Sequence, residues 1–477
     1  MKTISRRSFI GGAVAAGLPF TARSYARVIG ANDRIQIAEI GCGHRANGHR
    51  RMLKKSFATD PKFDLRSVCD LWSVNREKAA ADAKSLFGTT PKTFKYSEEL
   101  LADPDLDAVM IGTGDHQHAR ILAEVVRAGK DCYCEKPMAN TLADAKLARD
   151  TVRASKQIVQ LGSQWLSDPY QQRVREIVRS GKLGKIVSIS QSWNFNGPRW
   201  DVPNSPDIAA IREKDTDWNR WLLGRPARPF DPRVYFEFRI FKEFSGGITD
   251  QWYSHGSGLA HFYLDTFIPD DTVSNGGIFA WHDVRENPDT FQCLSTFTER
   301  QVLYDYGTTF GNAYGDHTII RGTQGTVYSP GGEGSPQWWF LAETKSAWGS
   351  NVVFDLKSAK GKPEAVTLAG STEIPPINQD DNLKYHTDDW FRCMRSRKAP
   401  NGNIETGFAT PLPSLWPRAV IVRAKRCTGI GKTKRSWTLA RCLRSLNPKE
   451  NLQTSRNYGQ RVQHYSQARF PSRDAIS

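Results

Sequence analysis

The chain has 477 residues, of which 11% are aromatic, and a formal net charge of +16 at pH 7. This length suffices for two domains with substantial cores, and the aromatic content argues against a disordered protein. The positive charge is concentrated in residues 410–477, which hold 14 Lys or Arg against two acids and leave a net charge of +4 for the preceding 409 residues. The main body therefore lacks the charge of a nucleic-acid-binding module, and we expect no nucleic-acid partner.

Residues 1–26 have the pattern of an export signal. Basic residues precede a short run rich in Gly and Ala, and the small-residue triplet Ser24-Tyr25-Ala26 follows. The apolar run is far shorter than the roughly 20 residues that a bilayer requires, so we expect no stable membrane span. Residues 5–10 (SRRSFI) resemble a twin-arginine signal, which implies passage of the folded protein through the twin-arginine export machinery to the periplasm or beyond. The alternative is a basic, disordered N-terminus. Folding before export also lets the eight cysteines be free thiols.

The first predicted strand, Ile35 to Ile40, leads into Gly41-Cys42-Gly43-His44-Arg45-Ala46 and then into a stretch with helical character. This is a G-x-G-x-x-A motif, in which two glycines allow a tight turn and the small third residue lets helix and strand pack. N–H groups at the helix start would hold a pyrophosphate. The alternative is a glycine-containing turn that matches this motif by chance. Glu39 stands out inside the strand, because a buried carboxylate is costly unless it is paired or protonated.

The second predicted strand, Phe63 to Cys69, ends at Asp70, 27 residues after Gly43. An acid at this strand end is placed to bind the adenosine ribose hydroxyls and disfavours a 2′-phosphate. We therefore expect NAD, with NADP possible because Arg76 lies close enough to offset the acid. The alternative role for Asp70 is to cap the following helix.

Two further strands, Asp107 to Thr113 and Lys130 to Cys134, flank a predicted helix over residues 118–128. Alternating strands and helices of these lengths predict a parallel, doubly wound sheet, whose ligands bind at the carboxyl ends of the strands. The residues at those ends are Thr113-Gly114-Asp115-His116-Gln117-His118 and Glu135-Lys136-Pro137.

Six motifs, in their order and spacing, resemble the Gfo/Idh/MocA family, named for glucose-fructose oxidoreductase and inositol dehydrogenase. They are GCGHRA, GTGDHQHA, CEKPMANT, QLGSQWLSDPYQQ, GGITDQWYSHGSGLAHF and HTDDWFRCMRSRK. The resemblance implies an α/β fold, with a Rossmann domain over residues 27–160 and an α/β domain with a large, mostly antiparallel sheet over 161–409. It also implies a homo-oligomer that transfers hydride between NAD(P) and a CH–OH group of a carbohydrate.

The resemblance places Lys136 between the nicotinamide and the substrate. The chemistry asks for such a group, because hydride leaves a carbinol carbon more readily as the hydroxyl proton is removed, and a partly desolvated lysine can take that proton. The alternative is a surface lysine after a strand. The cofactor-binding residues implied are Gly41, Gly43, His44, Arg45, Ala46, Asp70, Thr113, His116, His118, Glu135 and Lys136.

A second catalytic element in the family is an Asp followed by a His on one helix, after Gly-Gly. Here the matching residues are Asp250 and His255, which the resemblance assigns as orienting partner and acid/base. The chain departs from the family in its spacing of five rather than four, so the pair requires an irregular turn, and in Gly258, where an acid commonly stands. A capping role is the alternative for Asp250. The implied substrate-binding residues are Gln164, Trp165 and Tyr253.

Asp115, His116 and His118 look superficially like metal ligands, but no fourth ligand is evident, and we expect no metal. Aromatic residues offer a candidate sugar-stacking wall, with a core role as the alternative. They are Trp165, Tyr170, Trp193, Trp200 and Tyr235.

After Ala409 the chain leaves the family pattern for a basic tail, residues 410–477, that is poor in amphipathic periodicity and is predicted to be disordered. A permissible codon set for this segment, read displaced by one base, encodes HSVAISMAARSYREGKKVYWDRENEEIV, a family-like helix and strand. We therefore expect a one-base deletion or sequencing error near Ala409.

Three functions follow from these patterns. The first is hydride transfer on a sugar or polyol with a tightly held dinucleotide. The second is a glycosidase-like enzyme that retains NAD and shows no net redox change. The third is a binding protein with a degenerate site, which the spacing of Asp250 and His255 would explain.

Overall fold

The computed structural model describes residues 34–59, 63–332, 334–343, 372–375 and 382–410. These residues form two compact units, each built on one large sheet. Apart from the gaps above, the first unit takes residues 34–171, 200–245 and 382–408, and the second takes 172–199, 246–375 and 409–410. The predicted export signal and the basic tail beyond Thr410 lie outside the described residues.

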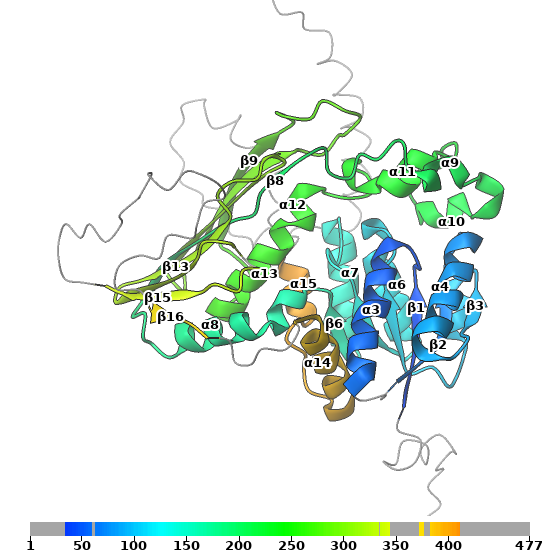
Figure 1. The fold of residues 1–477 in the computed structure, drawn as a ribbon, viewed down its shortest axis with the longest axis horizontal. Coiled ribbons are helices and arrows are strands. Elements are labelled where there is room, and N and C mark those ends of the chain that lie inside the picture. Colours follow the sequence, from blue (N-terminus) through cyan, green and yellow to red (C-terminus); the bar gives the residue numbers. More distant parts are fainter. Residues whose placement is uncertain (1–33, 60–62, 333, 344–371, 376–381, 411–477) are drawn as a thin grey trace, which may run out of the picture. The chain divides into compact units, whose positions relative to one another are not determined.

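A six-stranded parallel sheet in the order β3-β2-β1-β4-β5-β6 forms the core of the first unit (Figure 1). Its strands are β1 (Ile35–Ile40), β2 (Phe63–Cys69), β3 (Lys92–Phe94), β4 (Ala108–Ile111), β5 (Asp131–Cys134) and β6 (Val159–Leu161). The helices between them are α3 (His44–Thr59), α4 (Ser73–Phe87), α5 (Ser97–Leu101), α6 (Asp115–Arg127) and α7 (Leu142–Arg153). This order is that of the doubly wound dinucleotide-binding fold, so the predicted Rossmann fold is confirmed.

The buried carboxylate inside β1 is paired. Glu39 is fully buried, and Arg50 on α3 donates from Nη1 to its Oε2 over 2.6 Å. Burial raises the pKa of Glu39 to about 7, although the neighbouring guanidinium acts in the opposite direction. Such a pair makes the residue tolerable in a sheet that is covered on both faces.

Two C-terminal helices return to the first unit, so the unit extends beyond the predicted boundary at residue 160. They are α14 (Asn382–Ser396) and α15 (Ile404–Ala409). The Phe391 ring stacks on Phe63 of β2 with centroids 5.3 Å apart, and Arg397 pairs with Asp131 at 2.6 Å. The predicted boundary treats the first unit as one continuous stretch, whereas these contacts join residues more than 250 positions apart.

A second returning stretch, residues 200–245, is named here the cover segment. Its helices are α9 (Pro206–Ala210), η2 (Glu213–Asp215), α10 (Trp218–Leu222), α11 (Pro232–Glu237) and η3 (Phe238–Ile240). Trp218, Trp221 and Tyr235 form an aromatic cluster that includes Trp72, the residue before α4. Buried aromatic area of this kind stabilises the segment against the Rossmann core.

The second unit is built on a mostly antiparallel eight-stranded sheet in the order β16-β15-β14-β13-β7-β11-β10-β9, with β7 and β11 parallel. Its strands are β7 (Ile186–Ser192), β9 (Asp271–Gly277), β10 (Thr290–Phe297), β11 (Val302–Thr309), β13 (His317–Gly322), β14 (Gly325–Ser329), β15 (Trp339–Ala342) and β16 (Thr372–Glu373). Strands β8 (Phe195–Asn196) and β12 (Gly311–Asn312) form a separate ribbon. The helices of this unit are α12 (Ile248–Gln251), α13 (Tyr253–Leu264) and most of α8 (Pro169–Arg179), whose first three residues belong to the first unit. The predicted large, mostly antiparallel sheet is therefore confirmed.

The six cysteines within the described residues are all free and buried, as the sequence predicted for them. None of the helices that the structure describes is long and apolar enough to cross a membrane.

Candidate functional site

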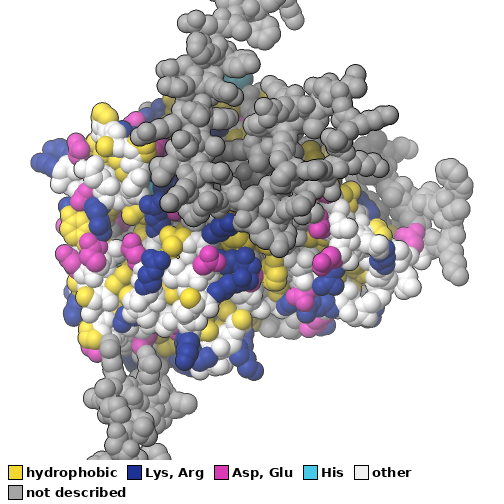
Figure 2. Space-filling view, turned by 180° about the vertical axis from the view of Figure 1, so that it is seen from behind, with side chains coloured by type: hydrophobic (Ala, Val, Ile, Leu, Met, Phe, Trp, Pro, Cys, Tyr) yellow, Lys and Arg dark blue, Asp and Glu magenta, His cyan; other side chains and the backbone are white. Residues whose placement is uncertain are grey.

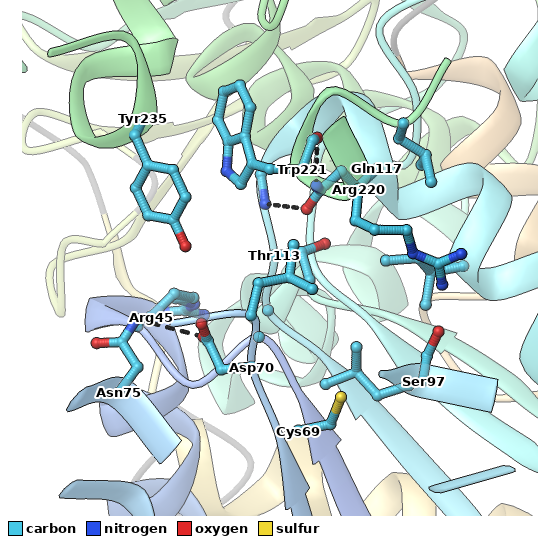
Figure 3. A pocket seen from close by; sticks show the side chains of 18 of the residues that line it. Arg45, Cys69, Asp70, Asn75, Ser97, Thr113, Gln117, Arg220, Trp221 and Tyr235 are labelled. Carbon is cyan, nitrogen blue, oxygen red and sulfur yellow. Dashed lines mark hydrogen bonds between the residues drawn. The ribbon is translucent and has the colours of Figure 1, made fainter. Parts of the chain in front are cut away.

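A cavity of about 260 Å³ lies in the first unit where the first four strands end (Figure 3). One side of it consists of the residues that follow β1, β2, β3 and β4, and the other side consists of the cover segment. Residues from both sides include Gly41, Gly43, Arg45, Asp70, Asn75, Lys95, Thr113, Gln117, Arg220, Trp221, Tyr235 and Arg239. The carboxyl edge of a doubly wound sheet is where this fold binds ligands.

The glycine loop fits a close-lying phosphate group. Gly41 has a φ of +84°, and a Cβ there would stand 2.6 Å from the backbone nitrogen of Thr113. Gly43 instead faces open space, with only Asn75 within 4 Å of a Cβ placed there. The loop leads directly into α3, whose first N–H groups have no partner within the helix. A turn held by Gly41 and left open at Gly43 is the cradle that a dinucleotide pyrophosphate requires.

Asp70 lies beside this loop and is held by three donors. Its carboxylate accepts hydrogen bonds from the backbone nitrogen of Cys42 (2.7 Å), that of Trp72 (2.9 Å) and the side-chain amide of Asn75 (3.3 Å). Burial raises the pKa of Asp70, and these donors act against that effect. Arg76 donates to the main-chain oxygen of Asp70 over 2.5 Å. The carboxylate is thus fixed on the cavity wall, and it also positions the glycine loop.

The cover segment supplies cavity residues that our sequence reasoning missed as part of this site. Gln117 of α6 donates to the main-chain oxygen of Trp221 over 2.7 Å, and Tyr235 stacks on Trp221 with centroids 5.3 Å apart. Tyr96 bonds Asp217 over 3.1 Å. The density of Trp and Tyr in residues 218–236 was the available signal, but nothing local shows that this stretch faces the glycine loop.

The two histidines after β4 turn toward protein partners. His116 Nε2 lies 2.8 Å from the main-chain oxygen of Trp221, and burial lowers the pKa of this ring well below its usual value. His118 Nδ1 lies 2.7 Å from the main-chain oxygen of Pro137. Of the residues assigned to cofactor binding in this loop, Thr113 lines the cavity, whereas the two nearly fully buried histidine rings position the cover segment and the loop at Pro137.

Glu135 forms a buried anionic centre directly before Lys136. Its Oε1 lies 2.6 Å from Arg45 Nη2, 2.9 Å from His49 Nε2 and 3.0 Å from the donating Gln164 amide. Arg45 and His49 hold the pKa of the carboxyl well below its usual value, although burial acts the other way. Gln164, which the resemblance assigns to the substrate, is buried in this structure and donates to Glu135 and to the Tyr133 hydroxyl.

Lys136 has a strongly altered acidity. Desolvation lowers the pKa of its amine to about 7, while the charges of Glu135 and Asp115 act in the opposite direction and those of Arg45 and Arg239 add to the lowering. Near neutral pH the amine is therefore divided between a neutral form that can accept a proton and a charged form that can return it.

In the second unit, Asp250 and His255 lie on consecutive helices rather than on one helix. Helix α12 ends at Gln251 and α13 begins at Tyr253, so the spacing of five residues is accommodated by the irregular turn that the sequence required. Asp250 Oδ2 accepts a hydrogen bond from the Gly246 backbone nitrogen over 3.0 Å. The His255 ring meets Trp193 edge-on with centroids 5.6 Å apart.

The remaining predicted substrate residues have different surroundings. Tyr253 is buried in the second unit, and its ring lies edge-on to that of Tyr306 with centroids 5.3 Å apart. Trp165 is only partly buried. The proposed aromatic wall is divided: Trp193 belongs to the second unit, where it stacks on Trp252 at 4.5 Å, whereas Tyr235 lines the cavity of the first unit.

Known proteins resemble this chain at the level of family and fold. The model of the GFO_IDH_MocA family, described as "Oxidoreductase family, NAD-binding Rossmann fold", matches residues 35–163. Inositol 2-dehydrogenase 2 of Saccharopolyspora erythraea is 27% identical over 192 residues, which cover 40% of this chain and 54% of that protein. Levoglucosan dehydrogenase of Pseudarthrobacter phenanthrenivorans is 30% identical over 179 residues, which cover 36% of this chain and 43% of that protein. The chain thus matches about half the length of these relatives.

Solved structures extend the likeness of the fold beyond the Rossmann sheet. A levoglucosan dehydrogenase in complex with NADH and levoglucosan has a TM-score of 0.60 and 18% identity, and the match covers 82% of this chain and 98% of that one. An oxidoreductase domain protein from Kribbella flavida has a TM-score of 0.62 at the same identity and coverage. Residues 35–163 thus match the NAD-binding Rossmann model of the Gfo/Idh/MocA oxidoreductase family, and the sheet order and the glycine-loop cavity agree with that match.

Proposed function

We propose that this protein is an NAD-dependent oxidoreductase that oxidises a CH–OH group of a sugar or polyol. The observation that carries the proposal is that one unit holds both a dinucleotide-type cavity and, one residue after the buried Glu135, a lysine whose pKa is lowered to about 7. The relatives named as inositol and levoglucosan dehydrogenases support a carbohydrate as the class of substrate.

Residues of the chain have separable roles in this reaction. The glycine loop and the start of α3 would hold the pyrophosphate, and Asp70 would bind the adenosine ribose. A bound NAD would supply the acceptor for the hydride of the carbinol carbon. Lys136 in its neutral form takes the proton of the hydroxyl group, so that the C–H and O–H bonds break as the carbonyl forms. His255 is proposed as a further acid/base, on the family resemblance of its position.

We further propose that the protein is exported by the twin-arginine route and acts as a homo-oligomer. The support for export is the basic and small-residue pattern of residues 1–26. An exported enzyme meets little free dinucleotide, so it must hold its cofactor tightly and regenerate it in place.

Native protein is accordingly expected to copurify with bound nicotinamide dinucleotide. Acid release followed by chromatography and mass spectrometry identifies the nucleotide, and a screen of sugars and polyols then follows its absorbance. Sugar release without accumulation of NADH would indicate the glycosidase-like alternative instead. Recovery of no nucleotide from cytoplasmically matured protein, together with no binding of added NAD, would refute the proposal.

Substitution of Asp70 should separate binding from chemistry. Asp70→Ala is expected to weaken NAD binding about tenfold or more, because a hydrogen bond to a charged partner contributes roughly 1.5–3 kcal/mol. The same substitution is expected to reduce the ratio by which the protein binds NAD more tightly than NADP. Asp70→Asn is the matched control for loop geometry, since its amide oxygen still accepts from Cys42. His255→Ala is expected to leave NAD affinity unchanged and to lower the single-turnover rate. Unchanged affinity in Asp70→Ala would remove this residue from the cofactor site.

A further inference from the structure

Arg45 occupies two environments at once. It lies in the first turn of α3, lines the cavity, and has a side chain that is 36% exposed. Its Nη2 lies 2.6 Å from the buried Glu135 Oε1, and its Nε is buried without a hydrogen-bond partner among the described residues. One guanidinium therefore faces both the ligand cavity and the anionic centre behind it.

The carboxylate of the anionic centre is enclosed by several contacts. The Glu135 carboxylate also accepts from the Gln164 amide, and its Oε2 accepts from the backbone nitrogen of Lys136 over 3.2 Å. Gly162 leaves room for it, because a Cβ at that position would stand 2.6 Å from the Glu135 carboxyl carbon. These contacts fix the position of the carboxylate next to the Arg45 guanidinium.

From these contacts we propose that Arg45 is a positioning residue that couples the dinucleotide cavity to Lys136, by neutralising Glu135 with the same guanidinium that faces the cavity. The inference rests on the proposed function, since it treats Lys136 as the group that exchanges a proton with the substrate. An anion bound at the start of α3 draws on the guanidinium that also balances Glu135. Occupation of the cavity and protonation of the lysine are then linked, and such linkage acts in both directions.

The charges near Lys136 determine in which direction a change at Arg45 or Glu135 shifts the titration midpoint of the lysine. Glu135 and Asp115 favour the protonated amine, and Arg45 and Arg239 oppose it. Loss of Arg45 removes a positive charge and also leaves Glu135 less neutralised, so both effects raise the titration midpoint of Lys136. Loss of the Glu135 charge removes the neighbouring anion and lowers the midpoint. Two neutral substitutions of one ion pair are thus expected to shift the same lysine in opposite directions.

The test titrates Lys136 directly and needs no turnover. Full-length protein labelled with [6-¹³C]lysine is followed by NMR between pH 5 and pH 10, and Lys136→Met assigns the resonance. Arg45→Gln is expected to move the midpoint up by about one pH unit or more, and Glu135→Gln to move it down by a similar amount. In a Glu135→Gln background the effect of Arg45→Gln should shrink, because part of it acts through the carboxylate.

Affinity for ADP-ribose, which carries the pyrophosphate without the nicotinamide ring, is measured on the same proteins. Arg45→Gln is expected to weaken binding about tenfold or more, whereas Glu135→Gln is expected to leave binding as tight as in the parent or tighter, because it frees the Arg45 guanidinium from its competing anion. Arg220→Gln is the matched control, because Arg220 also lines the cavity and pairs with a glutamate at 2.6 Å, but its partner is the exposed Glu98. This control should leave the Lys136 midpoint in place.

The outcomes separate the two proposals. If no protein binds ADP-ribose or NAD, the proposed function is wrong. If ADP-ribose binds but Arg45→Gln leaves the Lys136 midpoint unchanged, or moves it no more than Arg220→Gln does, the coupling is wrong and the function stands. Because Arg45 is partly exposed, Arg45→Gln is expected to fold, and the comparison of the two arginines decides the matter even if Glu135→Gln does not.

Discussion

Lys136→Ala is expected to lower the rate of hydride transfer by about 10²–10⁴-fold and to leave dinucleotide affinity largely unchanged. The substitution removes the group that accepts the hydroxyl proton, whereas the glycine loop and Asp70, which line the cavity, remain. Single-turnover absorbance at 340 nm and cofactor titration measure the two quantities separately. Lys136→Arg is the control for charge, since a guanidinium stays protonated and should be as slow as Ala.

The pH dependence of the same step has a definite direction. Because the pKa of Lys136 is lowered to about 7, the amine is mostly protonated below that pH and mostly neutral above it. Oxidation of the hydroxyl requires the neutral form, so its rate should rise with pH through about 7 and then level off, and carbonyl reduction should show the reverse. A flat profile from pH 5 to pH 9, with chemistry shown to be rate-limiting, would remove Lys136 from the proton transfer.

A methyl group added at two glycines of one loop should affect two different properties, the stability of the fold at Gly41 and the affinity for NAD at Gly43. Gly41→Ala is expected to destabilise the fold by about 2–4 kcal/mol, because its φ of +84° is strained for alanine and the Cβ would meet the backbone of Thr113. Gly43→Ala is expected to leave the free energy of unfolding nearly unchanged and to weaken NAD binding about tenfold or more, because its Cβ would enter the space left for the pyrophosphate.

Urea unfolding and cofactor titration of both glycine variants test this contrast. The prediction would be contradicted by a Gly43→Ala protein that binds NAD as tightly as the parent, or by a Gly41→Ala protein of parental stability.

Local pattern was sufficient for the sheet that carries the site. Strands β1 and β2 have the predicted bounds because each is a short stretch with regularly placed apolar residues that ends directly before a glycine turn or an acid, and both signals are local. The placement of Gly41 and Asp70 on the cavity follows from that order, since parallel strands bring their carboxyl ends to one edge.

Properties that depend on distant residues could not be read in this way. The side chain that neutralises Glu39 is Arg50 on the next helix, and the cavity wall opposite the glycine loop comes from Trp221 and Tyr235. The resemblance assigns His116 to the cofactor site, but nothing near it in the sequence indicates that its Nε2 lies 2.8 Å from the main-chain oxygen of Trp221, 105 positions later. The sequence identifies the side chains that are present, but their contacts depend on tertiary packing between residues that are distant in the chain.

The discontinuous first unit has a consequence for synthesis on the ribosome. A nascent chain that has emerged only through residue 163 has all six strands, but it lacks the cavity wall formed by Trp221 and Tyr235 and the helix that carries Phe391 onto Phe63. The apolar residues that these parts cover would remain exposed to solvent until residue 396 has left the exit tunnel. Premature termination before that point should therefore yield an aggregating fragment rather than a small nucleotide-binding domain.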